Sequence, residues 1–285
     1  MPEHVLIFEM APRDGLQNEA RPIPTADKVA LIDRLSACGF QKIETVSFVS
    51  PKWVPQMADG AEVMATLTRA HGTRYTALTP NLLGYERARE AGADEVAVFG
   101  SASEGFSQKN INCSIEEGLA RFAPVCEAAA RDRVPVRGYV SCVTDCPYDG
   151  SVAPQRVTEV AMRLHDMGCY EISLGDTIGA ATPESAARML DAITTELPPS
   201  QLAGHFHDTR GRALENIAVS LDAGLRVFDA SAGGLGGCPY APGAKGNVDT
   251  MAVAELLANR GFETGLDLKC LAEAASFART LRTPA

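Results

Sequence analysis

Short apolar runs rich in β-branched and aromatic residues recur along the chain, and longer segments whose apolar positions have helical spacing lie between them. Runs of this length and composition predict strands, and apolar positions that recur every three to four residues predict helices. The expected strands lie at residues 5–10, 42–48, 74–79, 95–100, 136–142, 170–176, 202–208 and 226–233. The expected helices include residues 25–39, 153–168, 213–224 and, near the end of the chain, 268–281.

Eight expected strands that alternate with helices over roughly 250 residues predict a (β/α)₈ TIM barrel. The main alternative, a doubly wound open sheet, carries a glycine-rich phosphate loop directly after its first strand. Here that place holds APRDGLQNE, which is not such a loop. We therefore predict a single domain over residues 1–285, with the barrel at about 4–262 and a short C-terminal helical extension at about 263–285.

Composition and charge narrow the possible partners. The chain is 46% apolar and 22% charged, as in an ordinary globular domain, and its net charge of −10 argues against nucleic acid or an anionic membrane as a partner. No basic leader and no run of about eighteen apolar residues is present, so we expect no membrane span and a cytoplasmic location. The eight cysteines form no C-x-x-C pair, and free thiols in a reducing cytosol are the simplest expectation.

Polar residues gather where the expected strands end, which is where barrel enzymes place their chemistry. They come from widely separated parts of the sequence, so the ordinary scatter of polar residues over a protein surface explains them poorly. The set comprises Glu9, Arg13 and Asp14 after the first strand, Glu44, Tyr139, Asp176, His205 and His207, with Cys238 and Asn247 in the loop after the last strand.

The pair His205 and His207 lies two positions apart on one expected strand, so both imidazoles face the same side, the barrel interior. Together with Asp14 and the Asn247 amide they form a mixed nitrogen and oxygen set that suits Mg²⁺, Mn²⁺ or Zn²⁺. The alternative is that one histidine is a hydrogen-bonded core residue. Arg13 beside Asp14 has an alternative too, an exposed ion pair of little energetic worth.

The segment SAGGLGGCPYAPGAKGN, residues 231–247, is too rich in glycine and proline to form a helix or an interior strand. It is also longer than the two to six residues that a simple connection needs. A functional loop that closes over substrate and carries the Cys238 thiol explains that length. The alternative is an inert buried cysteine.

Seven stretches give the chain a resemblance to a known family that covers nearly its whole length. They are APRDGLQNE, ETVSFVSPKWVPQMAD, QKNINCS, RGYVSCVTDCPYDG, YEISLGDTIGAATP, HFHDTRG and GGLGGCPYAPGAKGN. In this order they resemble the motifs of 3-hydroxy-3-methylglutaryl-CoA lyase, a member of the DRE-type TIM-barrel metallolyase superfamily. The resemblance implies a carbon–carbon lyase that cleaves this thioester to acetyl-CoA and acetoacetate, as in leucine degradation and ketone-body formation.

The resemblance also implies roles for single residues. It places the ligands of a divalent cation, Mg²⁺ or Mn²⁺, on Asp14, His205, His207 and Asn247, with Asp14 or His205 relaying the proton of the substrate hydroxyl. It places the catalytic cysteine on Cys238 and further active-site positions on Arg13, Gln17, Glu44, Tyr139 and Asp176, where Arg13 and Glu44 are catalytic and Arg13, Gln17, Tyr139 and Asp176 bind substrate. A CoA thioester substrate and a homodimer or larger homo-oligomer are implied as well.

The chain departs from the family at a position four residues beyond Asn247, where Met251 replaces an active-site glutamate. Cleavage of a related 3-hydroxy-3-methyl acyl-CoA is therefore an alternative. Two further alternatives are a Claisen condensing transferase of the same superfamily and a homologue that binds a metabolite or metal without catalysis.

Overall fold

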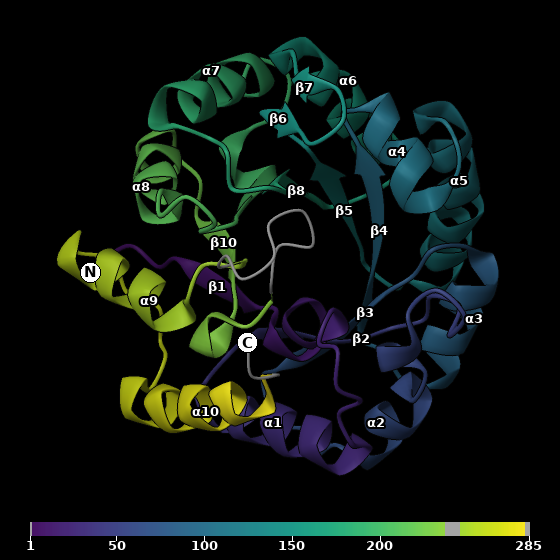
Figure 1. Ribbon diagram of the computed structural model, residues 1–285, viewed down its shortest axis with the longest axis vertical. Coiled ribbons are helices and arrows are strands. Elements are labelled where there is room, and N and C mark those ends of the chain that lie inside the picture. Colours follow the sequence, from purple (N-terminus) through teal and green to yellow (C-terminus); the bar gives the residue numbers. More distant parts are fainter. Residues whose placement is uncertain (1, 237–245, 283–285) are drawn as a thin grey trace.

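A computed structural model of the chain describes residues 2–236 and 246–282. Eight parallel strands close into a barrel in the order β1-β10-β9-β8-β5-β4-β3-β2, which confirms the predicted TIM barrel (Figure 1). The barrel strands are β1 (Leu6–Glu9), β2 (Lys42–Ser47), β3 (Arg74–Leu78), β4 (Glu95–Ser101), β5 (Val136–Ser141), β8 (Glu171–Asp176), β9 (Leu202–Phe206) and β10 (Val227–Ala230).

Helices surround the barrel because each crossover between parallel strands returns along the outside of the sheet. A two-stranded hairpin, β6 (Asp145–Cys146) with β7 (Gly150–Ser151), follows β5. The helices are α1 (Thr25–Ala37), α2 (Gly60–Thr66), α3 (Leu82–Glu90), α4 (Glu104–Ile111), α5 (Ile115–Asp132), α6 (Pro154–Asp166), α7 (Pro183–Ile193), α8 (Ala213–Asp222), α9 (Thr250–Asn259) and α10 (Leu268–Leu281). Short helical turns are η1 (Ala11–Gly15), η2 (Pro55–Met57), η3 (Pro199–Gln201) and η4 (Ala232–Gly234).

The apolar core lies mainly between the strands and the ring of helices. Strands covered on both faces are buried along almost their whole length, as in β8, where all six residues are buried. A second, smaller apolar cluster lies apart from this core and comprises Phe8, Met10, Leu78, Ala97 and Tyr139. Among the described helices, none combines the length and apolar character that crossing a bilayer requires.

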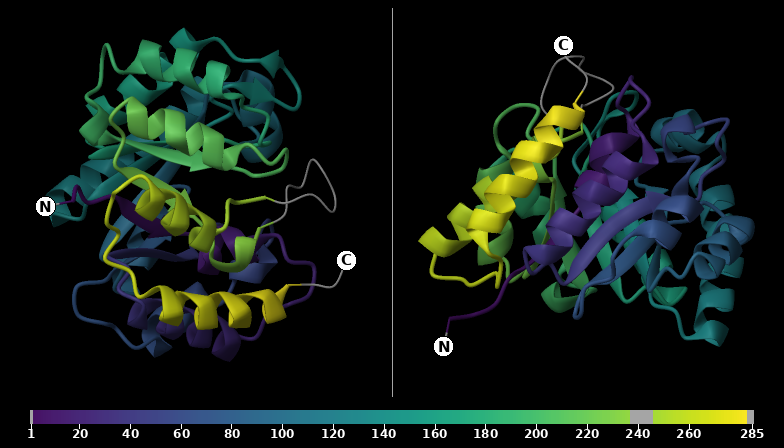
Figure 2. Two further views of the ribbon diagram at one scale, coloured as in Figure 1. Left: turned by 90° about the vertical axis from the view of Figure 1, so that its left-hand side faces the viewer. Right: turned by 90° about the horizontal axis from the view of Figure 1, so that it is seen from below.

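The C-terminal helix α10 is more than an extension, because it packs against α1, α9 and η4. Figures 1 and 2 show it running beside α1, so that the two ends of the chain complete the helical ring together. Asp267 caps this helix by accepting hydrogen bonds from the backbone N–H groups of Lys269 and Cys270. The segment after β10 therefore rests on the last helix of the chain.

One expectation about the cysteines is wrong. Cys38, just after α1, and Cys270, in the first turn of α10, form a disulfide with their Cα atoms 5.2 Å apart. This pair was not predictable from the sequence, since 232 positions separate the two residues and only the packing of α10 on α1 brings them together. Free, buried thiols remain at Cys113, Cys126, Cys142, Cys146 and Cys169.

Candidate active site

The turn after β1 presents two charged side chains at the carboxyl end of the barrel. Residues Ala11–Gly15 form the π-helical turn η1, which contains Arg13 and Asp14. This turn lies tightly against the segment after β10, since a Cβ on Gly15 would come within 2.8 Å of Leu235 Cβ. A side chain larger than hydrogen at position 15 would force these two rim segments apart.

Glu9 ties the same two segments together from below. Its carboxylate accepts hydrogen bonds from Ala11 N at 2.8 Å, from Ala232 N at 2.9 Å and from the Thr250 hydroxyl at 2.8 Å. Complete burial, opposed by these hydrogen bonds, raises the pKa of Glu9 to about 7. Glu9 thus has a structural role, since it links the turn after β1 to the segment after β10.

Arg13 is held by two carboxylates. Its Nε and Nη2 face Glu44 Oε2, and its Nη1 donates to Asp14 Oδ1 at 2.6 Å. The Tyr139 hydroxyl donates to the other Glu44 oxygen at 3.1 Å. Because the guanidinium is planar and always charged, this fixes a permanent positive charge in one orientation inside the barrel.

The cation-binding candidates converge beside this arginine. Ligand atoms of Asp14, His205 and His207 lie within 4.8 Å of one another. Asn247 joins them, since its Nδ2 donates to Asp14 Oδ2 at 2.7 Å and its backbone pairs with that of His207. The structure thus brings together the four residues that the sequence predicted as metal ligands.

The two histidines have the environment of metal ligands. Nδ1 of His205 lies 3.0 Å from Asp229 Oδ2, which leaves Nε2 available as a ligand atom. Nδ1 of His207 is buried and has no hydrogen-bond partner among the residues that the structure describes. Burial and then the charge of His205 lower the pKa of His207 to about 4, so this imidazole is neutral near pH 7 and its lone pair is available to a cation.

The surrounding charges favour a divalent cation as well. Six acidic or basic side chains line or support the site in addition to the histidines, and five of them are buried while Asp14 is half-buried. They are Arg13, Arg137, Asp14, Glu44, Glu171 and Asp229. When all are ionised, four carboxylates face two guanidinium groups, and a bound divalent ion balances the excess negative charge. The residues present therefore fit Mg²⁺, Mn²⁺ or Zn²⁺.

A cavity of about 1140 Å³ opens above these groups. Arg13, Asp14, His205 and His207 lie in its wall, as does Gln17, one of the predicted substrate-binding residues. Apolar side chains line another part of it, namely Leu78, Phe99, Phe106 and Phe122. Exposed Lys109 and Arg121 also contribute to the lining. Positively charged side chains therefore lie at this cavity although the protein as a whole is acidic.

The other predicted site residues have different surroundings. Tyr139 lines the cavity, whereas Asp176 is buried and accepts hydrogen bonds from Ala180 N at 3.0 Å and Ala181 N at 3.1 Å. Asp176 and Met251 are not among the described residues that line the cavity, and Met251 packs against the main core at the start of α9. Cys238 lies outside the described residues.

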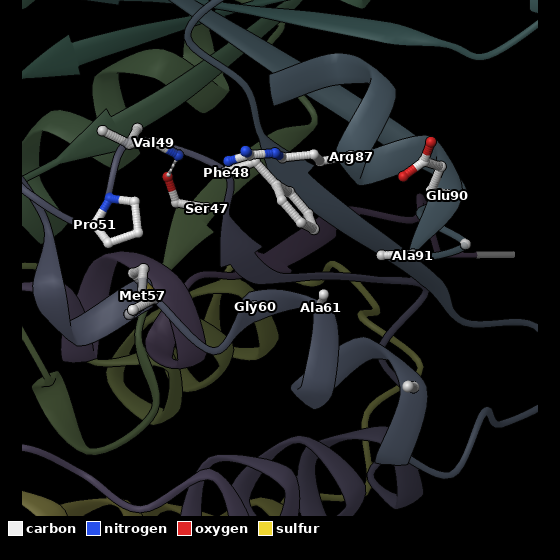
Figure 3. A pocket seen from close by; sticks show the side chains of 13 residues that line it. Ser47, Phe48, Val49, Pro51, Met57, Gly60, Ala61, Arg87, Glu90 and Ala91 are labelled. Carbon is white, nitrogen blue, oxygen red and sulfur yellow. Dashed lines mark hydrogen bonds between the residues drawn. The ribbon is translucent and has the colours of Figure 1, made fainter. Parts of the chain in front are cut away.

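A second cavity, of about 650 Å³, lies on the outside of the barrel between α2 and α3. Figure 3 shows Phe48 at its wall, with Arg87 and Glu90 reaching from α3 and Ala61 from α2. None of the described residues predicted for the active site lines this cavity. It is therefore separate from the cation-binding candidates.

The sequence analysis missed the charged residues inside the barrel, below the rim. Arg137 is fully buried and contacts Asp229, Glu171 and Tyr139. The signal was present in the strand pattern, since Arg137 lies two positions before Tyr139 and so faces the same side of β5. Asp229 similarly interrupts the apolar strand Val227–Ala230.

The fold and these residues define a class of protein, a (β/α)₈ barrel with a candidate cation site and a fixed arginine at the carboxyl end of its strands. Comparison with known proteins then gives the family. The family model described as HMGL-like matches residues 4–278, and the chain belongs to this family.

Relatives and solved structures agree with that assignment. The chain is 56% identical over 274 residues to the 3-hydroxy-3-isohexenylglutaryl-CoA/hydroxy-methylglutaryl-CoA lyase of Pseudomonas aeruginosa, covering 96% of this chain and 91% of the relative. It is 56% identical to the cytoplasmic 3-hydroxy-3-methylglutaryl-CoA lyase of Mus musculus, over 97% of this chain and 81% of the relative. The crystal structure of the HMG-CoA lyase from Brucella melitensis superposes with a TM-score of 0.97 at 64% identity, covering 98% and 99% of the two chains.

Proposed function

We propose that this protein cleaves 3-hydroxy-3-methylglutaryl-CoA to acetyl-CoA and acetoacetate in a retro-Claisen reaction assisted by a divalent cation. The observation that carries the proposal is the convergence of Asp14, His205 and His207 beside the fixed guanidinium of Arg13, in the wall of one large cavity. The names of relatives more than 50% identical to this chain, lyases for this same thioester, support the choice of substrate.

Cleavage of the bond between C2 and C3 requires three events. The C3 hydroxyl loses its proton as the C3–O bond becomes a carbonyl, the electron pair of the broken bond passes into a thioester enolate, and C2 of that enolate then gains a proton. The products are acetoacetate and acetyl-CoA, and no oxidant or second substrate is needed. The site must therefore hold one negative charge at the enolate oxygen and move two protons.

A divalent cation held by Asp14, His205, His207 and Asn247 would supply Lewis acidity that makes the C3 hydroxyl easier to deprotonate. The base that accepts this proton is Asp14 or His205. Arg13, held in place by Glu44, faces its positive charge toward the position where the enolate oxygen develops charge. Because its orientation is fixed before substrate binds, little reorganisation is needed during the reaction.

Cys238 is the proposed donor of the proton to C2 of the enolate. The glycine-rich loop that contains it connects η4 to Asn247, so one end of the loop is anchored on Glu9 and the other beside Asp14. We infer that this loop closes over bound thioester, brings the thiol to the enolate and excludes water. Gln17, Tyr139 and Asp176 complete the proposed substrate-binding set, Asp176 by holding the turn between β8 and α7.

A second candidate substrate is a 3-hydroxyglutaryl-CoA with a longer alkyl group at C3. The observation that favours it is the apolar part of the cavity wall, formed by Leu78, Phe99, Phe106 and Phe122. The Pseudomonas aeruginosa relative is named for an isohexenyl compound of this kind as well as for the methyl one. Met251, which stands where the family resemblance expects a glutamate, packs against the core and is not among the described residues of the cavity wall, so it does not favour either substrate.

The test is a direct assay of both reactions. Purified protein is stripped of metal, reloaded with Mg²⁺, Mn²⁺ or Zn²⁺, and incubated with the methyl and the isohexenyl thioesters in parallel while free acetyl-CoA is measured. Cleavage of the methyl compound that disappears with chelator and returns with Mg²⁺ or Mn²⁺ is expected. Full activity in the presence of chelator contradicts the cation's role, and no acetyl-CoA from either thioester with any of these ions contradicts the proposed reaction.

The biological setting is also a proposal. We propose that the enzyme acts in leucine degradation, in the cytoplasm, as a homodimer or larger homo-oligomer. Relatives carry both cytoplasmic and mitochondrial in their names. The Cys38–Cys270 disulfide stands against the proposed cytoplasmic location, because the cytoplasm keeps most thiols reduced, so the redox state of this pair in cells tests that location. Light scattering of the purified protein gives the oligomeric state, and thiol titration of the protein from freshly lysed cells gives the redox state of this pair.

A further inference from the structure

We propose that Arg137 is a positioning residue that couples the two halves of the active site, the cation ligand His205 and the substrate-facing Arg13. This inference rests on the proposed function, but part of its test needs no substrate. Arg137 is not one of the described residues that line the cavity, and it contacts Tyr139 and Asp229 rather than a candidate ligand atom. It acts through two chains of hydrogen bonds that begin at the same guanidinium nitrogen.

Arg137 is the largest of the fully buried side chains. It comes from the middle of the barrel interior, where its guanidinium lies 4.6 Å from the centre of the Phe8 ring. A buried cation is costly unless it is paired with carboxylates. Nε of Arg137 donates to Glu171 at 2.7 Å, and Nη2 forms an ion pair with Asp229 Oδ1 at 2.8 Å that lacks hydrogen-bond geometry.

The first chain leads to the cation ligand. Arg137 Nη1 donates to Asp229 Oδ2 at 3.0 Å, and the same oxygen lies 3.0 Å from Nδ1 of His205. Ser173 also donates to this oxygen, at 2.8 Å. A carboxylate that accepts from one ring nitrogen fixes the imidazole plane and directs the other nitrogen at the cation. Arg137 in turn fixes that carboxylate through two of its nitrogens.

The second chain leads to Arg13. Arg137 Nη1 also donates to the Tyr139 hydroxyl at 3.0 Å, which leaves the Tyr139 proton to be donated to Glu44 Oε1 at 3.1 Å. The other Glu44 oxygen holds Arg13. Arg137 thereby sets the direction of the tyrosine hydroxyl, the hydroxyl orients Glu44, and Glu44 orients the guanidinium that faces the enolate.

Lysine at position 137 would keep the charge and lose the coupling. A guanidinium offers five N–H groups in a rigid plane, whereas an ammonium is a point charge on a flexible stem. One ammonium can approach Asp229 or Tyr139 but does not reproduce contacts along three edges. The Arg137→Lys variant therefore tests whether the site needs only a buried positive charge at position 137 or also the hydrogen bonds that the planar guanidinium makes.

The test measures Mn²⁺ affinity and turnover in the whole protein for three single variants. Binding of Mn²⁺ followed by electron paramagnetic resonance requires no substrate. Asp229→Asn breaks the first chain and is expected to weaken Mn²⁺ binding by about 10- to 100-fold. Tyr139→Phe breaks the second chain and is expected to leave Mn²⁺ affinity within about twofold while kcat at saturating Mn²⁺ falls by about tenfold.

Arg137→Lys is expected to lose at least about tenfold in both measurements. Because Asp229 and Tyr139 share a donor in Arg137 Nη1, the effect of Asp229→Asn on Mn²⁺ affinity should be smaller in the Arg137→Lys background than in the wild type. Lys28→Met is the matched control. Lys28 is also a buried cation, paired with Asp59 at 2.7 Å outside the barrel, and its loss should lower stability without changing Mn²⁺ affinity.

Mn²⁺ affinity of Arg137→Lys within twofold of the wild type, or losses that simply multiply in the double variant, would overturn the coupling. If Arg137→Lys does not fold, the double variant of Asp229→Asn with Tyr139→Phe takes its place, since multiplicative losses in kcat there overturn the proposal equally. A wild-type protein that binds Mn²⁺ but releases no acetyl-CoA contradicts the proposed function alone, because the Mn²⁺ measurements still test the first chain.

Discussion

Each end of the barrel contains a cluster of largely buried polar side chains, and the two clusters differ in how their polar atoms are paired. At the amino end, Lys42, Glu95 and Tyr170 contact one another, with the Lys42 ammonium 3.3 Å from Glu95 Oε2 and the Tyr170 hydroxyl donating to the same carboxylate. At the carboxyl end, ligand atoms of Asp14, His205 and His207 converge, and no described residue forms a hydrogen bond with Nδ1 of His207. Both ends bury charge. Glu95 Oε2 accepts no hydrogen bond from the described residues but is ion-paired with Lys42, whereas at the carboxyl end three ligand atoms converge in a way that suits a cation.

The difference shows what distinguishes a structural polar cluster from a binding site. Buried polar groups are costly unless paired, so a cluster that satisfies itself contributes to the fold and has no capacity left for a ligand. A cluster with convergent ligand atoms and a ring nitrogen that lacks a hydrogen bond can instead bind a cation or a substrate. Variants at the two ends should accordingly divide into those that remove turnover and those that lower stability.

The largest loss of turnover is expected for Cys238→Ser, in the glycine-rich segment of the sequence between η4 and Asn247. A hydroxyl is nearly the same size as a thiol but far less acidic, so it is a poor proton donor to the enolate. Turnover should fall by about 10²- to 10⁴-fold, the usual contribution of a positioned general acid. Steady-state kinetics should place the loss in kcat more than in KM, with Mn²⁺ affinity retained. Near-normal turnover would mean that the loop serves only to cover the substrate.

A smaller loss is expected for Arg13→Lys, which keeps the charge at the carboxyl end. The ammonium cannot contact Glu44 through two nitrogens and present a fixed edge to the enolate at once. Turnover should fall by at least about tenfold, which corresponds to about 1.4 kcal/mol of lost transition-state stabilisation. The kcat of the purified variant at saturating substrate and Mg²⁺ measures it, and a loss below that size removes Arg13 as the enolate partner.

Glu9→Gln is expected to change the pH dependence of stability and to affect turnover little. Burial raises the pKa of Glu9 from 4.5 to about 7, so the folded protein binds this proton more tightly than the unfolded chain. Stability from this group is complete below about pH 4.5 and is lost as the pH rises through 7. Glutamine does not titrate. Urea denaturation should therefore show the free energy of unfolding of the variant rising relative to that of the wild type between pH 5 and pH 8, by at most about 3 kcal/mol. A constant difference across that range would contradict the assignment.

No loss of turnover is expected for Lys42→Met, at the amino end. The substitution leaves Glu95 buried without its ammonium partner, and breaking such a pair typically costs about 3 kcal/mol. Chemical denaturation should detect that cost, while kcat and Mn²⁺ affinity stay within twofold of the wild type. A large change in kcat would show that the two ends of the barrel are not independent.

Most of the fold could be predicted because parallel strands covered on both faces form continuous apolar runs. The run at 42–48 corresponds to β2 at Lys42–Ser47, and the run at 170–176 to β8 at Glu171–Asp176. The predicted strand at 226–233 was too long, since β10 ends at Ala230 and the chain turns at Gly233 with a φ of 73°. A strand pattern does not show where the backbone leaves the sheet.

The candidate site was predictable only in part. Asp14, His205, His207 and Asn247 were expected together because strand periodicity and the resemblance to a lyase family pointed the same way. Asp176 was expected to bind substrate, and no feature of the sequence indicates that its carboxylate accepts two backbone hydrogen bonds. Arg137 was missed because a buried arginine is rare, and its partners Asp229 and Glu171 lie 92 and 34 positions away. The roles of Cys238 and the substrate-binding residues stay predictions.

The bond between Cys38 and Cys270 turns most of this polypeptide into a covalent ring with two short tails. Seven of the eight barrel strands lie within that ring, and β1 alone lies on the amino-terminal tail. A protease that cuts one exposed connection on the ring would therefore leave a single molecule, which separates into two fragments only when reductant is added. Closing so long a loop also removes many conformations from the unfolded chain, on the order of 5 kcal/mol in the chain-entropy account. Reduction of one bond at the edge of the helical ring would thus alter how easily the whole barrel unfolds, without touching any atom of the active site.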